Sequence, residues 1–109
     1  MIKNDNIFIT HILKCIDSIF EYTKGMNEEN FLQNQLVQDA VIRNFEVIGE
    51  ATKNISEELK LKNQDIPWRK MAGMRDKLIH DYIGVDIFSV WAVVVKILPE
   101  LKSKLEKIK

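Results

Sequence analysis

The chain has 109 residues, which is enough for one domain (1–109) built around a single hydrophobic core. It is 46% hydrophobic and 29% charged and has only four glycines and two prolines, which excludes disordered or collagen-like chains and turn-rich β-sandwiches and barrels. The 16 basic and 16 acidic residues cancel, so the total charge gives no sign of a nucleic-acid partner.

The net charge of zero is the sum of two unlike halves. Residues 1–59 contain 5 Lys and Arg against 10 Asp and Glu, and residues 60–109 contain 11 against 6, which gives net charges of −5 and +5. Such asymmetry indicates an anion-binding half, two protomers that pack acidic face to basic face, or helix faces that merely differ in charge.

The sequence carries no sign of a membrane or secreted protein. Its longest uncharged apolar stretch, 87–95, is far shorter than the ~20 residues of a membrane span. The first ten residues lack the sustained apolar core of a signal peptide. Cys15 is the single cysteine, so an internal disulfide is excluded and a reducing cytosol fits. We therefore expect a cytoplasmic protein.

Apolar residues three and four positions apart predict two helices in the first half of the chain. The first runs from about Asn6 to Lys24. Asn27 is the predicted N-cap of a second helix of about seven turns, which reaches Ile55. Ser56 is placed to cap one further short turn.

Two further helices are predicted in the second half. Pro67 fits the first turn of a helix that runs from Trp68 to about Ile83. Asp86 caps the last helix, which Pro99 kinks or interrupts. Strand-like alternation and internal repeats are absent, so the predicted fold is all-α, an antiparallel bundle of four or five helices.

Arg75 is a charged residue in the middle of an apolar stripe. At about 100° per residue, seven apolar residues of its helix lie within about 80° of it, namely Trp68, Met71, Ala72, Leu78, Ile79, Tyr82 and Ile83. A buried guanidinium without a partner is costly, so Arg75 needs a carboxylate, backbone carbonyls or an anion beside it. Spacing alone leaves open an Arg paired inside a core or subunit interface and an Arg that binds an anion.

The second helix also carries polar residues near its apolar face. We predict Asn44 at the centre of that face, where it either sets the helix register or orients Arg75 from across the bundle. Arg43 and Glu50, seven residues apart, flank this face and are candidates to pair with the third helix or with a partner. In a purely structural bundle, Arg75 would instead pair with an internal carboxylate such as Glu50.

His80 is the other singular residue. It lies about 140° from Arg75 around an ideal helix, so the two do not share a face unaided. The reach of the Arg side chain, loosening of the helix near Gly84, or a site assembled between two protomers would bring them together. We assign no role to His11. Zinc-like ligand spacing, phosphate loops and nucleophile elbows are absent from the sequence, so we expect no metal and no cofactor.

Three collinear segments carry a resemblance to a known family. Residues 75–82 read RDKLIHDY, an R-x-x-x-x-H-x-Y motif that resembles the signature of HepT-type ribonuclease toxins of the HEPN superfamily. Residues 40–56 (AVIRNFEVIGEATKNIS) and 66–82 (IPWRKMAGMRDKLIHDY) are similar to that family's long second helix and its motif helix, and 85–94 (VDIFSVWAVV) to the start of its last long helix. The resemblance covers most of the chain.

The resemblance implies a HEPN-like bundle that is active as a homodimer, with the motif helices facing each other at the two-fold interface. It also implies a metal-independent RNA endonuclease in which Arg75 and His80 are catalytic. In such cleavage the 2′-hydroxyl attacks the adjacent phosphorus. Histidine can accept or donate a proton near neutral pH, and an arginine can stabilise the developing phosphorane charge. Two protomers would supply two motif histidines, one as base and one as acid.

The same resemblance implies a partner and a modification. Toxins of this type are neutralised by a minimal nucleotidyltransferase antitoxin of the MntA kind, which transfers AMP to the motif tyrosine, here Tyr82. Asp76 stands where the family often has a polar residue, and it would hold Arg75 or a partner. The RNA target, mRNA or tRNA, stays open, and so does a larger hetero-oligomer with the antitoxin. The alternative function is a non-catalytic nucleotide- or protein-binding helical module, which would need Arg75 for phosphate but tolerate loss of His80.

Overall fold

The computed structural model describes the backbone of residues 3–80 and 86–108 and the side chains of residues 4–74 and 86–108. Over these ranges the chain is helical and forms no strand, which confirms the all-α prediction. None of the described helices is long and apolar enough to cross a membrane. The segments are α1 (Lys3–Thr23), α2 (Glu28–Leu32), α3 (Gln35–Lys53), α4 (Glu57–Lys62), α5 (Trp68–His80), α6 (Ile87–Ala92), a π-helical turn (Val93–Ile97) and α7 (Leu98–Ile108).

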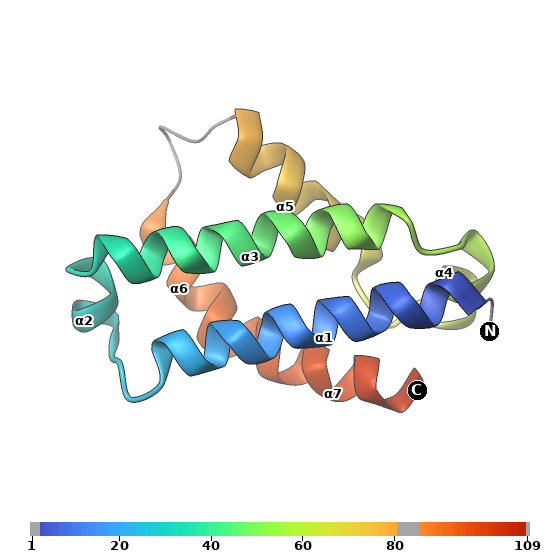
Figure 1. Cartoon of the computed structure of the whole chain (residues 1–109), viewed down its shortest axis with the longest axis horizontal. Coiled ribbons are helices and arrows are strands. Elements are labelled where there is room, and N and C mark those ends of the chain that lie inside the picture. Colours follow the sequence, from blue (N-terminus) through green and yellow to red (C-terminus); the bar gives the residue numbers. More distant parts are fainter. Residues whose placement is uncertain (1–2, 81–85, 109) are drawn as a thin grey trace.

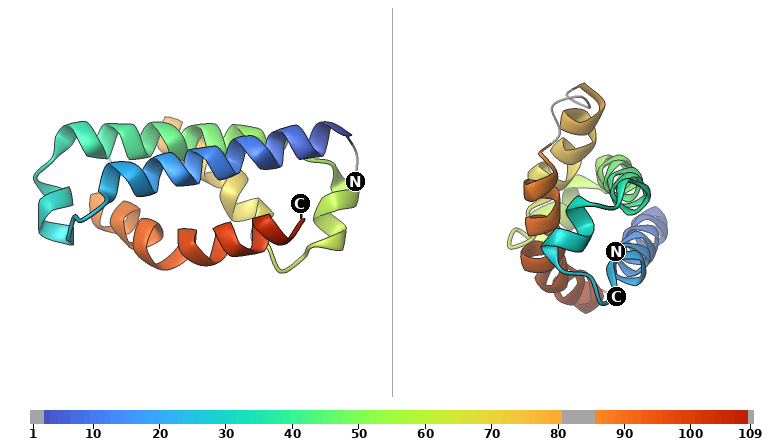
Figure 2. Two further views of the ribbon diagram at one scale, coloured as in Figure 1. Left: turned by 60° about the horizontal axis from the view of Figure 1, so that its bottom comes forward. Right: turned by 90° about the vertical axis from the view of Figure 1, so that its left-hand side faces the viewer.

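The helices form an antiparallel bundle in which α3 packs against both α1 and α5. Figure 1 shows α1 and α3 side by side and running in opposite directions, with α6, the π turn and α7 as one rod behind them. α5 leans against the other long side of α3, and the short α2 and α4 close the two ends of the bundle (Figures 1 and 2). α5, which contains the motif from Arg75 to His80, is therefore supported mainly by α3.

One hydrophobic cluster joins α1, α3 and the rod. The spacing of Ile9, Ile12, Ile16 and Ile19 predicted the first helix, and all four are fully buried in this cluster. The buried face of α1 is therefore the one that its apolar spacing predicts. α1 begins three residues earlier and ends one residue earlier than predicted. The fully or almost fully buried members of the hydrophobic cluster include Ile9, Ile12, Ile16, Ile19, Val41, Phe45, Ile48, Leu98 and Leu105.

The predicted second helix is in fact two helices, α2 and α3, which is a correction to the sequence-based boundary. The Asn34 side chain accepts a hydrogen bond from the backbone N–H of Val37 at 3.0 Å and so caps a new helix. The buried Gln38 amide donates to the carbonyl oxygens of Phe31 (2.9 Å) and Leu32 (3.1 Å) at the end of α2. These side chains satisfy backbone groups that a continuous helix would have paired internally, so the chain turns here.

The last helix starts as predicted but changes its geometry before Pro99. The Asp86 carboxylate caps α6, because it accepts from the backbone N–H of Phe88 at 3.0 Å. The interruption lies over Val93–Ile97, where the chain forms a π turn and the Leu98 N–H donates to the carbonyl of Val93. Proline lacks an N–H and its ring crowds the carbonyl four residues earlier, which a wider turn relieves. Residues 95–97 are consecutively exposed as a result.

A buried carboxylate ties the start of α1 to the start of α4. Asp5 is 2% exposed, and its oxygens accept from the backbone N–H of Ser56 at 2.8 Å and from the Ser56 hydroxyl at 2.6 Å. The Ser56 hydroxyl oxygen in turn accepts from the N–H of Leu59 at 3.2 Å, which confirms Ser56 as a helix cap. Asp5 thus fixes the cap of α4 from 51 residues away in the sequence.

Replacing Asp5 should therefore weaken the fold. Asp5→Ala should lower the free energy of unfolding by about 2 to 3 kcal/mol, because it removes two hydrogen bonds to a buried charged acceptor. Urea denaturation followed by circular dichroism measures the change. The matched control is Asp17→Ala, which breaks an exposed ion pair with Lys102 and should cost far less. Equal losses in the two variants would contradict the structural role of Asp5.

Candidate functional site

The first turn of α5 is anchored by two buried side chains. Trp68 and Met71 are 7% and 2% exposed. The indole N–H of Trp68 donates to the carbonyl oxygen of Asn63 at 3.0 Å, and the N–H of Met71 donates to the carbonyl of Pro67 at 3.0 Å. α5 therefore begins at Trp68, as predicted, and Pro67 lies immediately before it. These contacts set both the start of α5 and its rotation about its axis.

That rotation puts positions 75 and 80 on different sides of α5. Position 75 follows Trp68 by seven residues and Met71 by four, so it belongs to the stripe that faces the core. Position 80 is about 140° away, on the outward side. The side chains of Arg75, Asp76 and His80 lie outside the described residues, as do all of Tyr82 and the predicted helix end at Gly84.

Asn44 is not at the centre of the buried face of α3, contrary to the prediction. It is half-buried, and its amide nitrogen donates to the carbonyl of Ala40 at 2.9 Å within the same helix. α3 packs against both α1 and α5, so its apolar arc is broad and spacing alone misplaces the centre. The buried stripe instead runs through Gln38, Val41, Ile42, Phe45, Ile48, Gly49 and Thr52.

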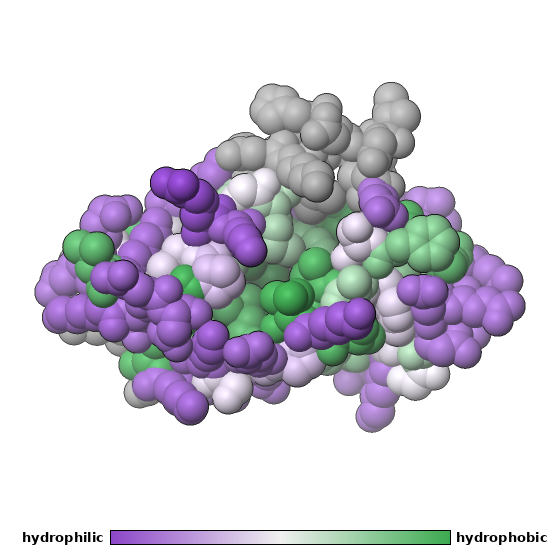
Figure 3. Space-filling view, turned by 180° about the vertical axis from the view of Figure 1, so that it is seen from behind, coloured by the Kyte–Doolittle hydropathy of each residue, from purple (hydrophilic) through white to green (hydrophobic). Residues whose placement is uncertain are grey.

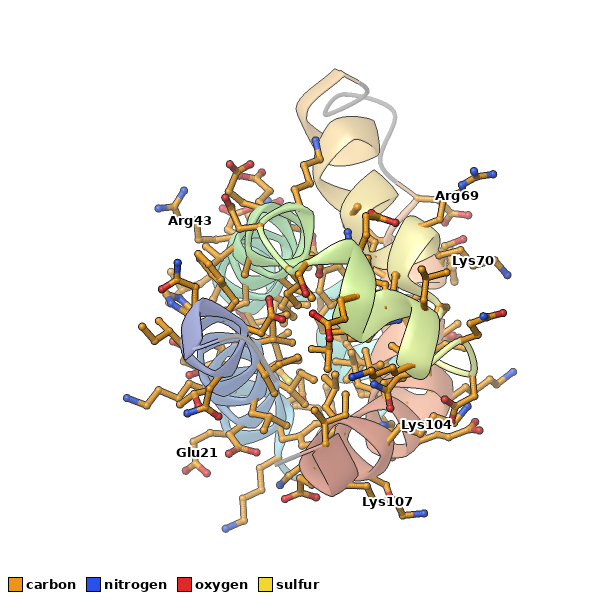
Figure 4. All side chains as sticks on the ribbon, turned by 90° about the vertical axis from the view of Figure 1, so that its right-hand side faces the viewer. Glu21, Arg43, Arg69, Lys70, Lys104 and Lys107 are labelled. Atoms are coloured by element: carbon orange, nitrogen blue, oxygen red, sulfur yellow. The ribbon has the colours of Figure 1, made fainter. Side chains whose placement is uncertain are left out.

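Arg43 and Glu50 line a cavity of about 380 Å³ between α3 and α1, with Phe8 and His11 on its α1 wall. Both residues are exposed. In Figure 4, Arg43 extends from the side of the bundle opposite to Arg69 of α5. The expected pairing of Arg43 with the third predicted helix stays a prediction, because the carboxylates of that helix, Asp76 and Asp81, lie outside the described side chains. Pairing with a partner also stays a prediction.

Basic residues from the second half of the sequence gather on one side of the bundle. Figure 4 shows Arg69, Lys70 and Lys104 on the side of the bundle opposite to α1 and α3. Lys104 pairs with Glu100 at 3.3 Å, but Arg69, Lys70 and Lys96 form no ion pair within the described part of the chain. A neutral chain thus presents an unneutralised basic surface beside the first half of α5.

The same side of the molecule exposes hydrophobic surface. Figure 3 shows it hollowed, with hydrophobic side chains at the centre and hydrophilic ones around them. The rod formed by α6, the π turn and α7 contributes Phe88, Val95 and Ile97, which are 58%, 45% and 48% exposed. Exposed apolar side chains surrounded by hydrophilic ones are typical of a binding surface.

The described residues offer neither a metal site nor an activated thiol. No three His, Cys, Asp or Glu side chains among them gather closely enough to hold a metal ion. Burial raises the pKa of the Cys15 thiol, so at neutral pH this side chain is a packing group and not a thiolate nucleophile.

Comparison with known proteins assigns the chain to a family. A sequence model described as "Ribonuclease HepT-like" matches residues 12–108. The chain belongs to the HepT-like ribonuclease family. A Thermococcus cleftensis protein named "Probable ribonuclease HepT" is 44% identical over 109 residues, which are 100% of this chain and 99% of that protein.

A second relative is longer than this chain. A Methanocaldococcus jannaschii protein named "Gamma-glutamylcyclotransferase and putative RNase" is 47% identical over 108 residues, which are 99% of this chain but 49% of that protein. This chain thus spans about half the length of that relative. No solved structure matches the chain.

Arg69, Lys70 and Lys96 are surface residues of this HepT-like chain that the sequence analysis did not single out. Each is a common charged residue among many, and spacing does not tell which lysines and arginines have carboxylate partners. One signal was present in the sequence: Arg69 precedes His80 by eleven residues, which returns a helix to nearly the same side after three turns.

The anchoring of α5 can be tested by stability. Trp68→Ala should lower the free energy of unfolding by about 3 to 5 kcal/mol, and Trp68→Phe by about 1 to 2 kcal/mol because it removes mainly the hydrogen bond to Asn63. Leu61→Ala is the control, since Leu61 is 65% exposed. Urea denaturation measures all three, and a Trp68→Ala loss as small as that of Leu61→Ala would refute the anchor.

Proposed function

We propose that this chain is the toxin of a toxin–antitoxin pair and a metal-independent RNA endonuclease, with Arg75 and His80 as catalytic residues in the cleft of a cytoplasmic homodimer. Family membership supports the ribonuclease activity. The observation that carries the two-protomer catalytic site is the rotation of α5, which gives the two motif positions different orientations. An unneutralised basic surface beside the same helix supports RNA as the substrate.

The proposed reaction needs one base, one acid and one cation. An imidazole takes the proton of the 2′-hydroxyl, whose oxygen then bonds to the adjacent phosphorus. A second imidazole, in its protonated form, gives a proton to the departing 5′-oxygen as the P–O5′ bond breaks, leaving a 2′,3′-cyclic phosphate. The guanidinium of Arg75 stabilises the extra negative charge on the phosphorane oxygens. Imidazole suits both proton transfers because its unperturbed pKa of about 6.5 lies near neutral pH.

A dimer resolves the geometric difficulty of a single protomer. Positions 75 and 80 lie about 140° apart on one helix, so one copy does not present both to the same phosphate by helix geometry alone. Two motif helices that face each other would bring position 80 of one protomer toward position 75 of its partner. The core-facing stripe of α5 would then continue into the dimer seam, where a charged residue finds an anion.

The proposed regulation acts through Tyr82. A minimal nucleotidyltransferase antitoxin would transfer AMP to its hydroxyl, which adds bulk and negative charge seven residues after Arg75. The added phosphate would compete with RNA for the guanidinium. Asp76 is proposed to hold Arg75 or the antitoxin, and the toxin and antitoxin would assemble into a hetero-oligomer.

The catalytic assignment is tested by two substitutions. His80→Ala should lower the rate of RNA cleavage by roughly 100-fold or more, and Arg75→Ala by a similar factor, because each removes one transition-state contribution. Both variants should stop growth inhibition while keeping the helical circular-dichroism spectrum and the dimer mass. Cleavage of labelled RNA on denaturing gels measures the rates.

The controls separate catalysis from binding. Unmodified wild-type protein, purified without its antitoxin, must cleave RNA if the proposal holds. If it leaves every RNA intact and RNA binding survives His80→Ala, the non-catalytic binding module replaces the enzyme.

The regulatory assignment is tested by mass spectrometry after co-expression with the proposed nucleotidyltransferase antitoxin. Wild-type protein should gain adenylyl increments and lose RNA cleavage, because the new phosphate lies beside the catalytic residues. Tyr82→Phe should gain none and should still cleave RNA. Adenylylation of Tyr82→Phe to the wild-type extent would place the modification on another residue.

A further inference from the structure

One outward stripe of α5 joins Arg69, Gly73 and the motif position 80. Gly73 follows Arg69 by four residues, and position 80 follows Arg69 by eleven, so all three fall within about 40° around the helix axis. The buried residues Trp68 and Met71 define the opposite side. The stripe is about 16 Å long from position 69 to position 80.

Gly73 has no internal reason to be glycine. It lies inside a helix, where glycine is less favourable than alanine, and it is not among the described glycines with a positive φ. A Cβ atom built at this position would meet nothing within 4 Å. Neither backbone conformation nor packing among the described residues therefore requires glycine here. A close approach by something outside the chain does explain it.

Arg69 has the chemistry of an anion-binding residue. It is exposed and has no ion pair within the described part of the chain, whereas Lys60, Lys62, Lys102 and Lys104 each pair with a carboxylate. Figure 4 shows Arg69 and Lys70 extending outward from the side opposite to α1 and α3. A guanidinium offers a planar fork of donors that matches two oxygens of a phosphate.

We propose that the stripe formed by Arg69, Gly73 and position 80 holds the sugar–phosphate backbone of the RNA strand that is cleaved. Arg69 is a positioning residue that binds a phosphate upstream or downstream of the scissile one, and Gly73 lets the strand lie against the helix between them. The inference rests on the proposed function, which puts the His80 imidazole at the scissile phosphate. RNA is favoured over an acidic protein surface because the stripe leads from an unpaired cation, across a bare backbone, to the catalytic position.

The salt dependence of RNA binding tests Arg69. The probe is a labelled mixed-sequence single-stranded RNA, and the protein is the full-length His80→Ala variant, which binds without cleaving. Adding Arg69→Gln should weaken binding about tenfold and should reduce the slope of log K against log salt by about 0.7, the value for one lost phosphate contact on a single strand. The matched control, Lys14→Gln, changes an exposed cation on α1 that has no ion pair among the described residues, and it should alter neither quantity.

Kinetics in the catalytically intact protein give a second reading of Arg69. Arg69→Gln should raise KM about tenfold with little change in kcat or in the pH profile, because the residue holds RNA and transfers no proton. Arg69→Lys should recover part of the loss, since it restores the charge without the fork.

Two substitutions at Gly73 separate clearance from folding. Gly73→Ala and Gly73→Leu should each raise Tm by roughly 4 to 8 °C, since both residues favour helix more than glycine does. Gly73→Leu should nevertheless weaken RNA binding about tenfold, because its side chain fills the path of the strand, and Gly73→Ala should weaken it less. Unchanged RNA binding by the better-folded Gly73→Leu would overturn the inference.

The outcomes distinguish this inference from the proposed function. If wild-type protein cleaves RNA but Arg69→Gln behaves like Lys14→Gln, the stripe does not hold the RNA backbone and the catalytic proposal stands. If wild-type protein cleaves no RNA but Arg69→Gln lowers the salt slope as expected, RNA binding by the stripe stands and the catalytic proposal fails. If Arg69→Gln and Gly73→Leu alter the dimer mass or antitoxin binding and leave the salt slope unchanged, the stripe is a protein interface and the inference is overturned.

Discussion

The burial of Trp68 and Met71 against the core is the constraint on which the candidate site depends. A helix is rigid about its axis, so the rotation set in its first turn carries through to its last. With the start of α5 fixed, position 75 belongs to the inward side and position 80 to the outward side. A single helix therefore divides the motif between two surfaces, and a second motif helix is the simplest way to reunite them at one phosphate.

The surface charges of this neutral chain are unevenly distributed. α1 and α3 form one side of the bundle, while Arg69 and Lys70 of α5 and Lys104 of α7 lie on the other (Figure 4). The Lys102–Asp17 ion pair joins α7 to α1. The hydrogen bond and charge of Asp17 raise the pKa of Lys102, so that pair stays ionised well above neutral pH. Arg69, Lys70 and Lys96 are left facing solvent, which is where an anionic strand would approach.

Polar residues shape this fold as much as the apolar pattern does. Asn34 and Gln38 divide the predicted long helix by capping its two parts, and the Asp5 carboxylate holds Ser56 from 51 residues away. Apolar periodicity is insensitive to both effects, because it registers which face is buried and not which backbone groups have side-chain partners. Apolar spacing also put Asn44 at the centre of the buried face of α3, because it does not show that α3 packs against two neighbouring helices.

The sequence by itself determined the all-α class, the buried face of α1, the caps at Ser56 and Asp86, and the family, through the spacing of apolar residues and the R-x-x-x-x-H-x-Y motif. These are local properties, since a helical face or a cap depends on residues within a few turns. Only the tertiary structure decided which cations lack partners, that Arg43 faces away from α5, and that Gly73 has open space beside it. Those facts depend on which helices pack together, and contacts between distant segments leave no periodic trace in the sequence.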